Sequence, residues 1–195
     1  MEGTDKELVD LYRRGHVEAL DALIERYRRM LFGYIFNMVG GSADADEIFQ
    51  ETWFRVIRKI GGYRERNFGG WLVRIARNIA IDRIRRRKPD LSLDAEPEEG
   101  RSLAEVIPGQ DPGPRRRVEA RDTGSAIARA VAGLPLEQRE VFLMRVEADL
   151  SFKEIARAQR VSINTALARM QYALAKLRLS LKTEYDGMTV KGGRT

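Results

Sequence analysis

The residues best suited to chemistry lie near the C-terminal end of the chain, where two short helices are predicted in succession. Ser151-Phe-Lys-Glu154 forms a capping box at the start of the first, and a serine caps the second. The outward face of the second helix carries small, polar and basic side chains: Ser162, Asn164, Thr165, Ala168, Arg169 and Tyr172. Such residues contact phosphates and base edges, so the pattern predicts a helix-turn-helix in the DNA major groove. The alternative is an ordinary helical hairpin.

A second basic stretch lies in the N-terminal half, from Arg74 to Lys88, with seven basic residues and one acid. Helical spacing places four polar side chains on one face: Arg74, Arg77, Asn78 and Arg85. The preceding loop mixes aromatic, polar and basic residues: Tyr63, Arg64, Arg66, Asn67 and Phe68. Aromatic rings stack on unpaired bases and cations follow the backbone, so this part is predicted to bind opened DNA strands. Core packing is the alternative for Phe68, and the preferred one for Trp71.

A third cluster is acidic and begins with Asp44-Ala-Asp-Glu47, which resembles a capping box. Its helix is predicted to expose Asp46, Glu47, Gln50, Glu51 and Arg55. Carboxylates repel DNA, so this face is predicted to bind a protein. Simple compensation of charge at the helix N-terminus is one alternative. A nuclease metal site is another, but no second acidic cluster or catalytic Lys/His pair accompanies it. We therefore predict no catalytic residue, metal or cofactor.

The elements that carry these clusters are all predicted to be helices. No segment shows the alternation of apolar and polar residues that is typical of a strand. Helix-capping residues recur between stretches with apolar residues at helical spacing. The expected helices begin at Thr4 and Asp44 and cover 19–38, 68–88, 123–132, 151–158 and 162–184, with another starting at Pro135. In the 162–184 helix, the apolar residues expected to be buried are Ile163, Ala166, Leu167, Met170, Ala173, Leu174 and Leu177.

Charge and proline content divide this all-α chain into two domains. Net charge is +6, with net +5 over 1–88, −4 over 89–122 and +5 over 123–195. Five of the six prolines and no aromatic residue lie in 89–122, which is therefore predicted to be a flexible acidic linker. The predicted parts are a domain at 1–88, the linker at 89–122, a domain at 123–185 and a tail at 186–195. Without a cysteine, a signal peptide or a membrane-length apolar run, a cytoplasmic protein without membrane insertion is expected.

In this order and spacing, the clusters resemble bacterial RNA polymerase sigma factors of the extracytoplasmic function (ECF) group. The run Asp44-Ala-Asp-Glu-Ile-Phe-Gln-Glu-Thr-Trp-Phe-Arg55 is similar to region 2.2 of the family, and 68–87 to regions 2.3 and 2.4. The segments 134–145, 150–156 and 161–165 are similar to region 4. The resemblance covers nearly all of the chain except the linker and the last ten or so residues.

The resemblance implies a division of labour among the three clusters. The acidic face would dock on the β′ clamp helices of core RNA polymerase, and region 4 would also meet the β flap. The aromatic-basic loop and the Arg-rich helix would recognise and open the −10 element of promoter DNA. The helix-turn-helix would read the −35 element, the linker would run toward the RNA exit path, and an anti-sigma factor would occlude these surfaces.

Two residues depart from the family pattern in the helix-turn-helix. Arg160 stands where the turn usually has glycine, and we expect a wider turn because a left-handed residue other than glycine is strained. Leu167 replaces a basic residue, which loses a phosphate contact and extends the apolar stripe.

Three other functions were weighed against a sigma factor. A stand-alone helix-turn-helix regulator would leave the 63–71 loop and the acidic helix without a role. A DNA-processing enzyme lacks a catalytic constellation, and an anti-sigma-like scaffold does not explain two basic domains.

Overall fold

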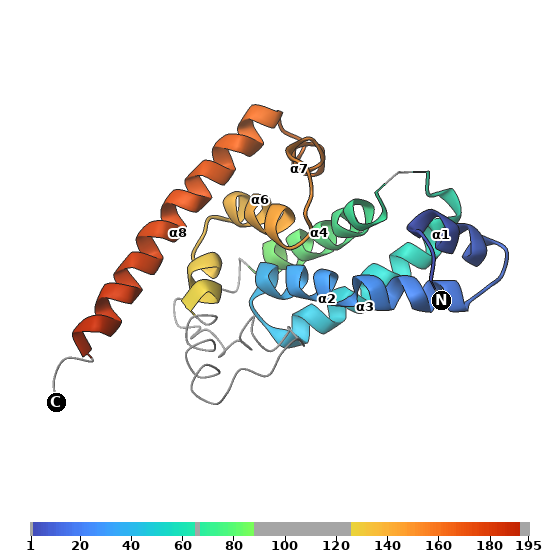
Figure 1. Ribbon diagram of the computed structural model, residues 1–195, viewed down its shortest axis with the longest axis horizontal. Coiled ribbons are helices and arrows are strands. Elements are labelled where there is room, and N and C mark those ends of the chain that lie inside the picture. The colour runs from blue at the N-terminus through green and yellow to red at the C-terminus, as the bar shows by residue number, and fades with distance from the viewer. Residues whose placement is uncertain (1, 65–66, 88–125, 192–195) are drawn as a thin grey trace. The chain divides into compact units, whose positions relative to one another are not determined.

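The computed structural model describes residues 2–64, 67–87 and 126–191, and every regular element in these ranges is a helix (Figure 1). The helices are α1 (Asp5–Arg13), α2 (Glu18–Val39), α3 (Ser42–Lys59), the 3₁₀ turn η1 (Ile60–Gly62), α4 (Phe68–Arg87), α6 (Leu136–Val146), α7 (Phe152–Gln159) and α8 (Ile163–Lys191). Residues 126–132 are also helical. The all-α prediction is confirmed, and none of the helices searched among the described residues is long and apolar enough to cross a membrane.

The described residues form two compact units: the first holds those up to residue 87 together with Glu147–Leu150, and the second holds 126–146 and 151–191. The predicted linker, 89–122, lies outside the described residues, so its flexibility and the domain boundaries at both of its ends stay predictions. In the first unit, α2, α3 and α4 pack against one another, and α1 packs on α2. Burial of large side chains such as Leu23, Tyr34, Ile35, Ile48 and Leu72 stabilises this bundle.

Local sequence signals set two helix ends at the start of this unit. The capping box at α1 is confirmed, since the Thr4 amide donates to Glu7 Oε2 at 2.7 Å and the Glu7 amide to Thr4 Oγ1 at 3.3 Å. α2 ends at Gly40, which takes the left-handed conformation with φ +77°. Its amide donates to the carbonyl oxygen of Phe36 at 2.8 Å, which closes the last turn.

The capping box predicted at Asp44 is wrong. Gly41 is extended, so α3 begins at Ser42 and Asp44 already lies in the first helical turn. The Asp44 side chain is buried, and Arg83 Nη1 of α4 donates to its Oδ1 at 3.2 Å. The carboxylate therefore joins two helices instead of capping one.

The side chain of Arg13 ties α1 to the end of α3. Its Nε and Nη2 donate to the carbonyl oxygen of Ile60 at 3.2 and 2.9 Å, and Nη2 also donates to that of Tyr63 at 2.5 Å. These charge-assisted bonds add donors to carbonyl groups at a helix end, where the Ile60 oxygen also accepts the Tyr63 amide at 3.1 Å.

The start of α4 is shaped by a close approach to α2. Asn67 is the N-cap, because its Oδ1 accepts the Gly70 amide at 2.8 Å. A Cβ on Gly69 would lie 2.9 Å from Cε1 of Tyr27, so only glycine fits there without a shift. Burial and the bond from its hydroxyl to Asp5 Oδ2 raise the pKa of Tyr27, so this side chain stays neutral and anchored.

In the second unit, α6, α7 and α8 surround a core that includes Val141, Leu143, Met144 and Ile155. The capping box at α7 is confirmed: the Ser151 amide donates to Glu154 Oε2 at 2.9 Å. α8 continues to Lys191, beyond the predicted end near residue 184, so the predicted tail at 186–195 begins inside this helix.

We predict that Gly69→Ala lowers the free energy of unfolding by about 1–3 kcal/mol, because the new methyl group overpacks the contact with the Tyr27 ring. Urea denaturation of the full-length protein measures this. Gly61→Ala is the matched control, since a Cβ on Gly61 meets nothing within 4 Å. Equal effects of the two substitutions would contradict the steric account.

Candidate nucleic-acid and protein interfaces

The exposed face of α3 is less acidic than its sequence suggests. Asp46, Glu47 and Gln50 are exposed, while Glu51 and Arg55 are half-buried. Glu51 Oε1 accepts from Arg55 Nε at 2.7 Å, and Glu47 Oε2 accepts from Arg83 Nη2 at 2.5 Å. The bond to Glu47 also raises the pKa of Arg83. A groove between α3 and α4 is lined by acids and arginines of both helices, so the face offers alternating charges.

Two apolar residues on α3 were missing from the predicted site. Phe54 is 61% exposed and Ile57 39% exposed, four and seven positions after Gln50. This spacing puts them on the same side of the helix as Gln50. The signal was present in the sequence, because Phe54 falls outside the buried stripe of Ile48, Thr52 and Val56. Exposed aromatic surface beside charge is typical of protein interfaces.

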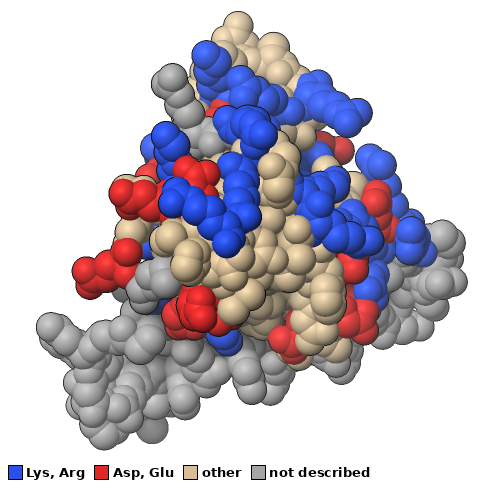
Figure 2. All heavy atoms as spheres, turned by 90° about the vertical axis from the view of Figure 1, so that its right-hand side faces the viewer, with Lys and Arg blue, Asp and Glu red and all other residues tan. Residues whose placement is uncertain are grey.

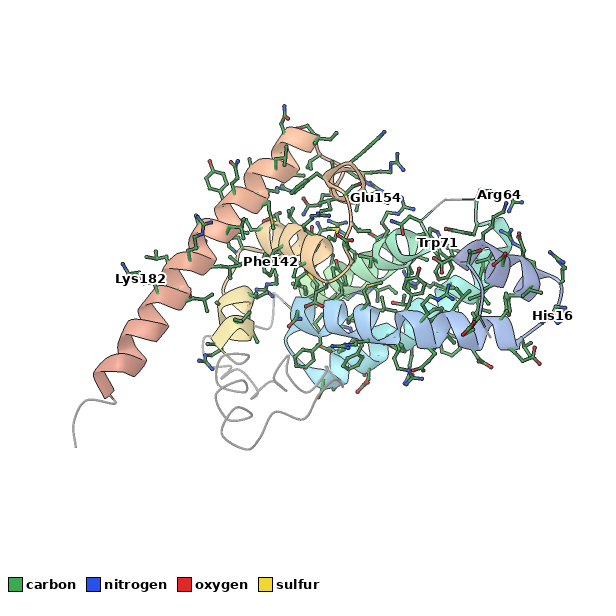
Figure 3. The ribbon with its side chains drawn as sticks, viewed as in Figure 1. His16, Arg64, Trp71, Phe142, Glu154 and Lys182 are labelled. Carbon is green, nitrogen blue, oxygen red and sulfur yellow. The ribbon has the colours of Figure 1, made fainter. Side chains whose placement is uncertain are left out.

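Basic side chains collect on and before α4. Arg74 and Arg77 are half-buried, whereas Asn78 and Arg85 are exposed, which is consistent with one polar face along the helix. Arg64 is exposed and lies at the edge of its unit (Figure 3). Arg66 lies outside the described residues. Figure 2 shows Lys and Arg side chains interspersed with Asp, Glu and uncharged surface.

The aromatic residues of the loop pack on one another instead of facing solvent. Phe68 is fully buried and Tyr63 is 8% exposed. Their ring centroids lie 5.5 Å apart, and the Trp71 ring lies 4.9 Å from Tyr63 and 5.5 Å from Phe68. In this conformation Tyr63 and Phe68 therefore belong to the core, the alternative stated above for Phe68, and neither ring has a face free for a base. Trp71 is half-buried and keeps part of its surface exposed.

Asn67, also expected to bind DNA, instead uses its side-chain oxygen as the helix cap. Although the residue is exposed, this bond gives Asn67 a structural role at the start of α4.

The second unit contains a helix-turn-helix formed by α7 and α8. Ser162 caps α8, since its Oγ accepts the Thr165 amide at 3.0 Å. Asn164, Thr165 and Tyr172 are exposed, and Ala168 and Arg169 are half-buried. The structure therefore brings the predicted DNA-reading residues together on the outer side of α8.

The apolar stripe of α8 is only partly covered, so its predicted burial is partly wrong. Ala166, Ala173 and Leu177 are buried and Met170 is half-buried, but Leu167 is 38% and Leu174 37% exposed. Ile163 is 46% exposed. The stripe is wider than the contact that α6 and α7 make with this helix.

The turn between α7 and α8 is tight. Arg160 itself takes the left-handed conformation, with φ 57° and ψ 46°, and the Val161 amide donates to the carbonyl oxygen of Ala156 at 3.0 Å. This is the bond of a Schellman motif. The expectation of a wider turn is wrong, because Arg160 adopts the strained left-handed conformation and the turn stays tight.

The described residues contain no group of three or more His, Asp or Glu side chains placed to hold a metal ion. The chain has a single histidine, His16, which is exposed in the turn between α1 and α2 (Figure 3).

Two family models match the chain: sigma-70 region 2 over residues 23–89 and sigma-70 region 4 over residues 125–177. The protein is 29% identical over 185 residues to the ECF RNA polymerase sigma factor SigW of Bacillus subtilis, covering 93% of this chain and 99% of the relative. It is 32% identical over 178 residues to the ECF sigma factor BldN of Streptomyces coelicolor, covering 88% of this chain and 64% of the relative.

A solved structure with a similar fold is the sigma factor RpoE of Bartonella quintana, co-crystallised with the anti-sigma factor NepR. The TM-score is 0.65 at 20% identity, and the match covers 83% of this chain and 97% of the other.

The two helical units and the family models define a two-domain transcription initiation factor of the sigma-70 type. Within that class, the chain belongs to the ECF group of RNA polymerase sigma factors. It binds core RNA polymerase, directs promoter-specific initiation, and is not an enzyme.

We predict that Arg160→Gly raises the free energy of unfolding by about 0.5–1 kcal/mol, because glycine relieves the left-handed strain at small cost in chain entropy. Thermal unfolding of the full-length protein checks the sign. Arg157→Gly, inside α7, should instead lower stability by about 1 kcal/mol. A loss of stability in Arg160→Gly would show that the arginine makes contacts that outweigh its strain.

Proposed function

We propose that α3 docks this sigma factor on the β′ clamp helices of core RNA polymerase through Asp46, Glu47, Gln50, Glu51 and Arg55. The observation that carries the proposal is the composition of this face, where exposed acids lie beside the exposed Phe54 and Ile57. Carboxylates there repel a phosphate backbone, whereas a protein surface accepts both charge and apolar area.

The opened −10 element of promoter DNA binds along α4. Arg74, Arg77, Asn78 and Arg85 supply a polar face for a single strand, and Arg64 extends it. Trp71, in the first turn of α4, is half-buried whereas Tyr63 and Phe68 are buried, so among these three aromatic residues Trp71 takes the stacking role.

The −35 element is read as duplex by α8. Asn164, Thr165, Arg169 and Tyr172 stand on its outer side, and the capped N-terminus of α8 suits a phosphate. The same unit meets the β flap of polymerase. The linker, whose sequence is acidic, runs toward the RNA exit path.

An anti-sigma factor regulates the protein by covering these surfaces. The support is the similar fold of the Bartonella sigma factor, which is bound to an anti-sigma factor in its crystal. Since both polymerase and promoter are cytoplasmic, the protein acts in the cytoplasm.

A transcription assay tests the proposed function directly. Core RNA polymerase with this protein should give a promoter-specific transcript from promoters of its own genome, whereas core polymerase alone should give none. Absence of a transcript on all of them would exclude the sigma function. Tight binding of the free protein to duplex sites without polymerase would favour a stand-alone regulator.

We predict that Gln50→Ala combined with Glu51→Ala weakens binding to core polymerase about tenfold, because the double change removes two contacts near the centre of the docking face. Competition for core polymerase against the labelled wild-type protein measures the loss. Glu25→Ala, on an exposed part of α2, is the control and should bind as the wild type does. An unchanged affinity in the double variant would remove this face from the docking site.

A further inference from the structure

Three polar side chains from three helices meet in the core of the second unit: Glu140 of α6, Gln159 of α7 and Arg169 of α8. Gln159 Nε2 donates to Glu140 Oε2 at 2.6 Å and to the carbonyl oxygen of Glu137 at 3.0 Å. At its other end, Gln159 Oε1 accepts from Arg169 Nη1 at 2.9 Å. The side-chain amide thus joins a buried acid to an arginine on the outer helix.

The orientation of this amide follows from its partners. A carboxylate and a carbonyl oxygen only accept, and a guanidinium only donates, so Nε2 must face Glu140 and Oε1 must face Arg169. Glu140 is 2% exposed and Gln159 is 9% exposed. Both are held by packing, which makes the acceptor presented to Arg169 a fixed point.

This bond takes only part of the hydrogen-bond donor capacity of Arg169. A guanidinium has five N–H donors in a planar fork, and Gln159 occupies one. The side chain is half-buried, so other donors remain on the solvent side of α8, where Thr165 and Tyr172 are exposed. A guanidinium fixed at one corner loses less freedom when it meets a base edge.

We propose that Gln159 is a positioning residue for base reading: the relay Glu140–Gln159–Arg169 sets the direction of the Arg169 guanidinium before DNA arrives. The proposal rests on the function given above, in which α8 reads duplex DNA. It assigns specificity to a buried residue that does not itself meet the nucleic acid.

The experiment uses the full-length protein bound to core RNA polymerase. A duplex is selected from a randomised library by the wild-type complex, and each base pair of its upstream element is then substituted in turn. Affinities for this series are measured for the wild type, Arg169→Ala, Gln159→Met and the double variant. Arg169→Ala identifies the base pair that this arginine reads.

Gln159→Met keeps the side-chain length and removes the relay. It should lower discrimination at the base pair of Arg169 by about fivefold to tenfold, and leave other positions within about twofold. The double variant should be no worse than Arg169→Ala alone, because the two residues act as one unit. Unaltered discrimination, an additive double variant, or an equal loss at every position would overturn the relay.

The matched control is Gln138→Met on α6, where the side-chain oxygen is buried and makes no hydrogen bond within the described residues. It should leave discrimination unchanged. Thermal unfolding shows whether Gln159→Met folds; if it does not, Gln159→Asn replaces it, since the shorter amide cannot reach both partners. If Arg169→Ala lowers discrimination but Gln159→Met or Gln159→Asn does not, the relay is refuted while the base-reading role of Arg169 stands. No effect of Arg169→Ala removes Arg169 from the reading residues and overturns the relay, whereas a wild-type complex that selects no upstream sequence at all contradicts the proposed function.

Discussion

The hydrogen bonds from Arg83 to Asp44 and Glu47 join α4 to α3. These are the two helices to which the proposed function assigns the partners of the first unit. α3 carries the face assigned to polymerase, and α4 carries the arginines assigned to DNA. Because the Asp44 carboxylate is buried, it is stable only while a cation stays beside it, so the two helices keep one relative position. In the proposed function, these bonds link the docking face to the helix that binds the opened strand.

Local signals predicted the helices and most of their ends, because caps and glycine stops act within a few residues. Thr4, Gly40 and Ser151 are examples. The predictions from local sequence failed where a contact with a residue far along the chain determines the structure. Asp44 has the sequence context of a cap, yet Arg83 is 39 positions away. Tyr63 and Phe68 suit base stacking by type, and only the fold shows that they fill the core.

The sequence predicted which helix face carries each candidate site, but it predicted less well which side chains contact one another there. Helical spacing placed Asn164, Thr165 and Arg169 on one side of α8, whereas the link from Arg169 through Gln159 depends on how three helices meet. In the proposed function the two units differ in their target: one reads duplex DNA, and the other binds opened strands and a protein.

The length of α8 has a mechanical consequence. Its 29 residues span about 43 Å at 1.5 Å per residue, and its later turns extend past α6 and α7 (Figure 1). The side chains to which the proposed function assigns base reading lie in its first turns. A tilt of roughly 5° about its N-terminal end moves the far end by about 4 Å on that length. Because the first turns lie at the pivot, the same tilt changes the direction of their side chains but hardly their position.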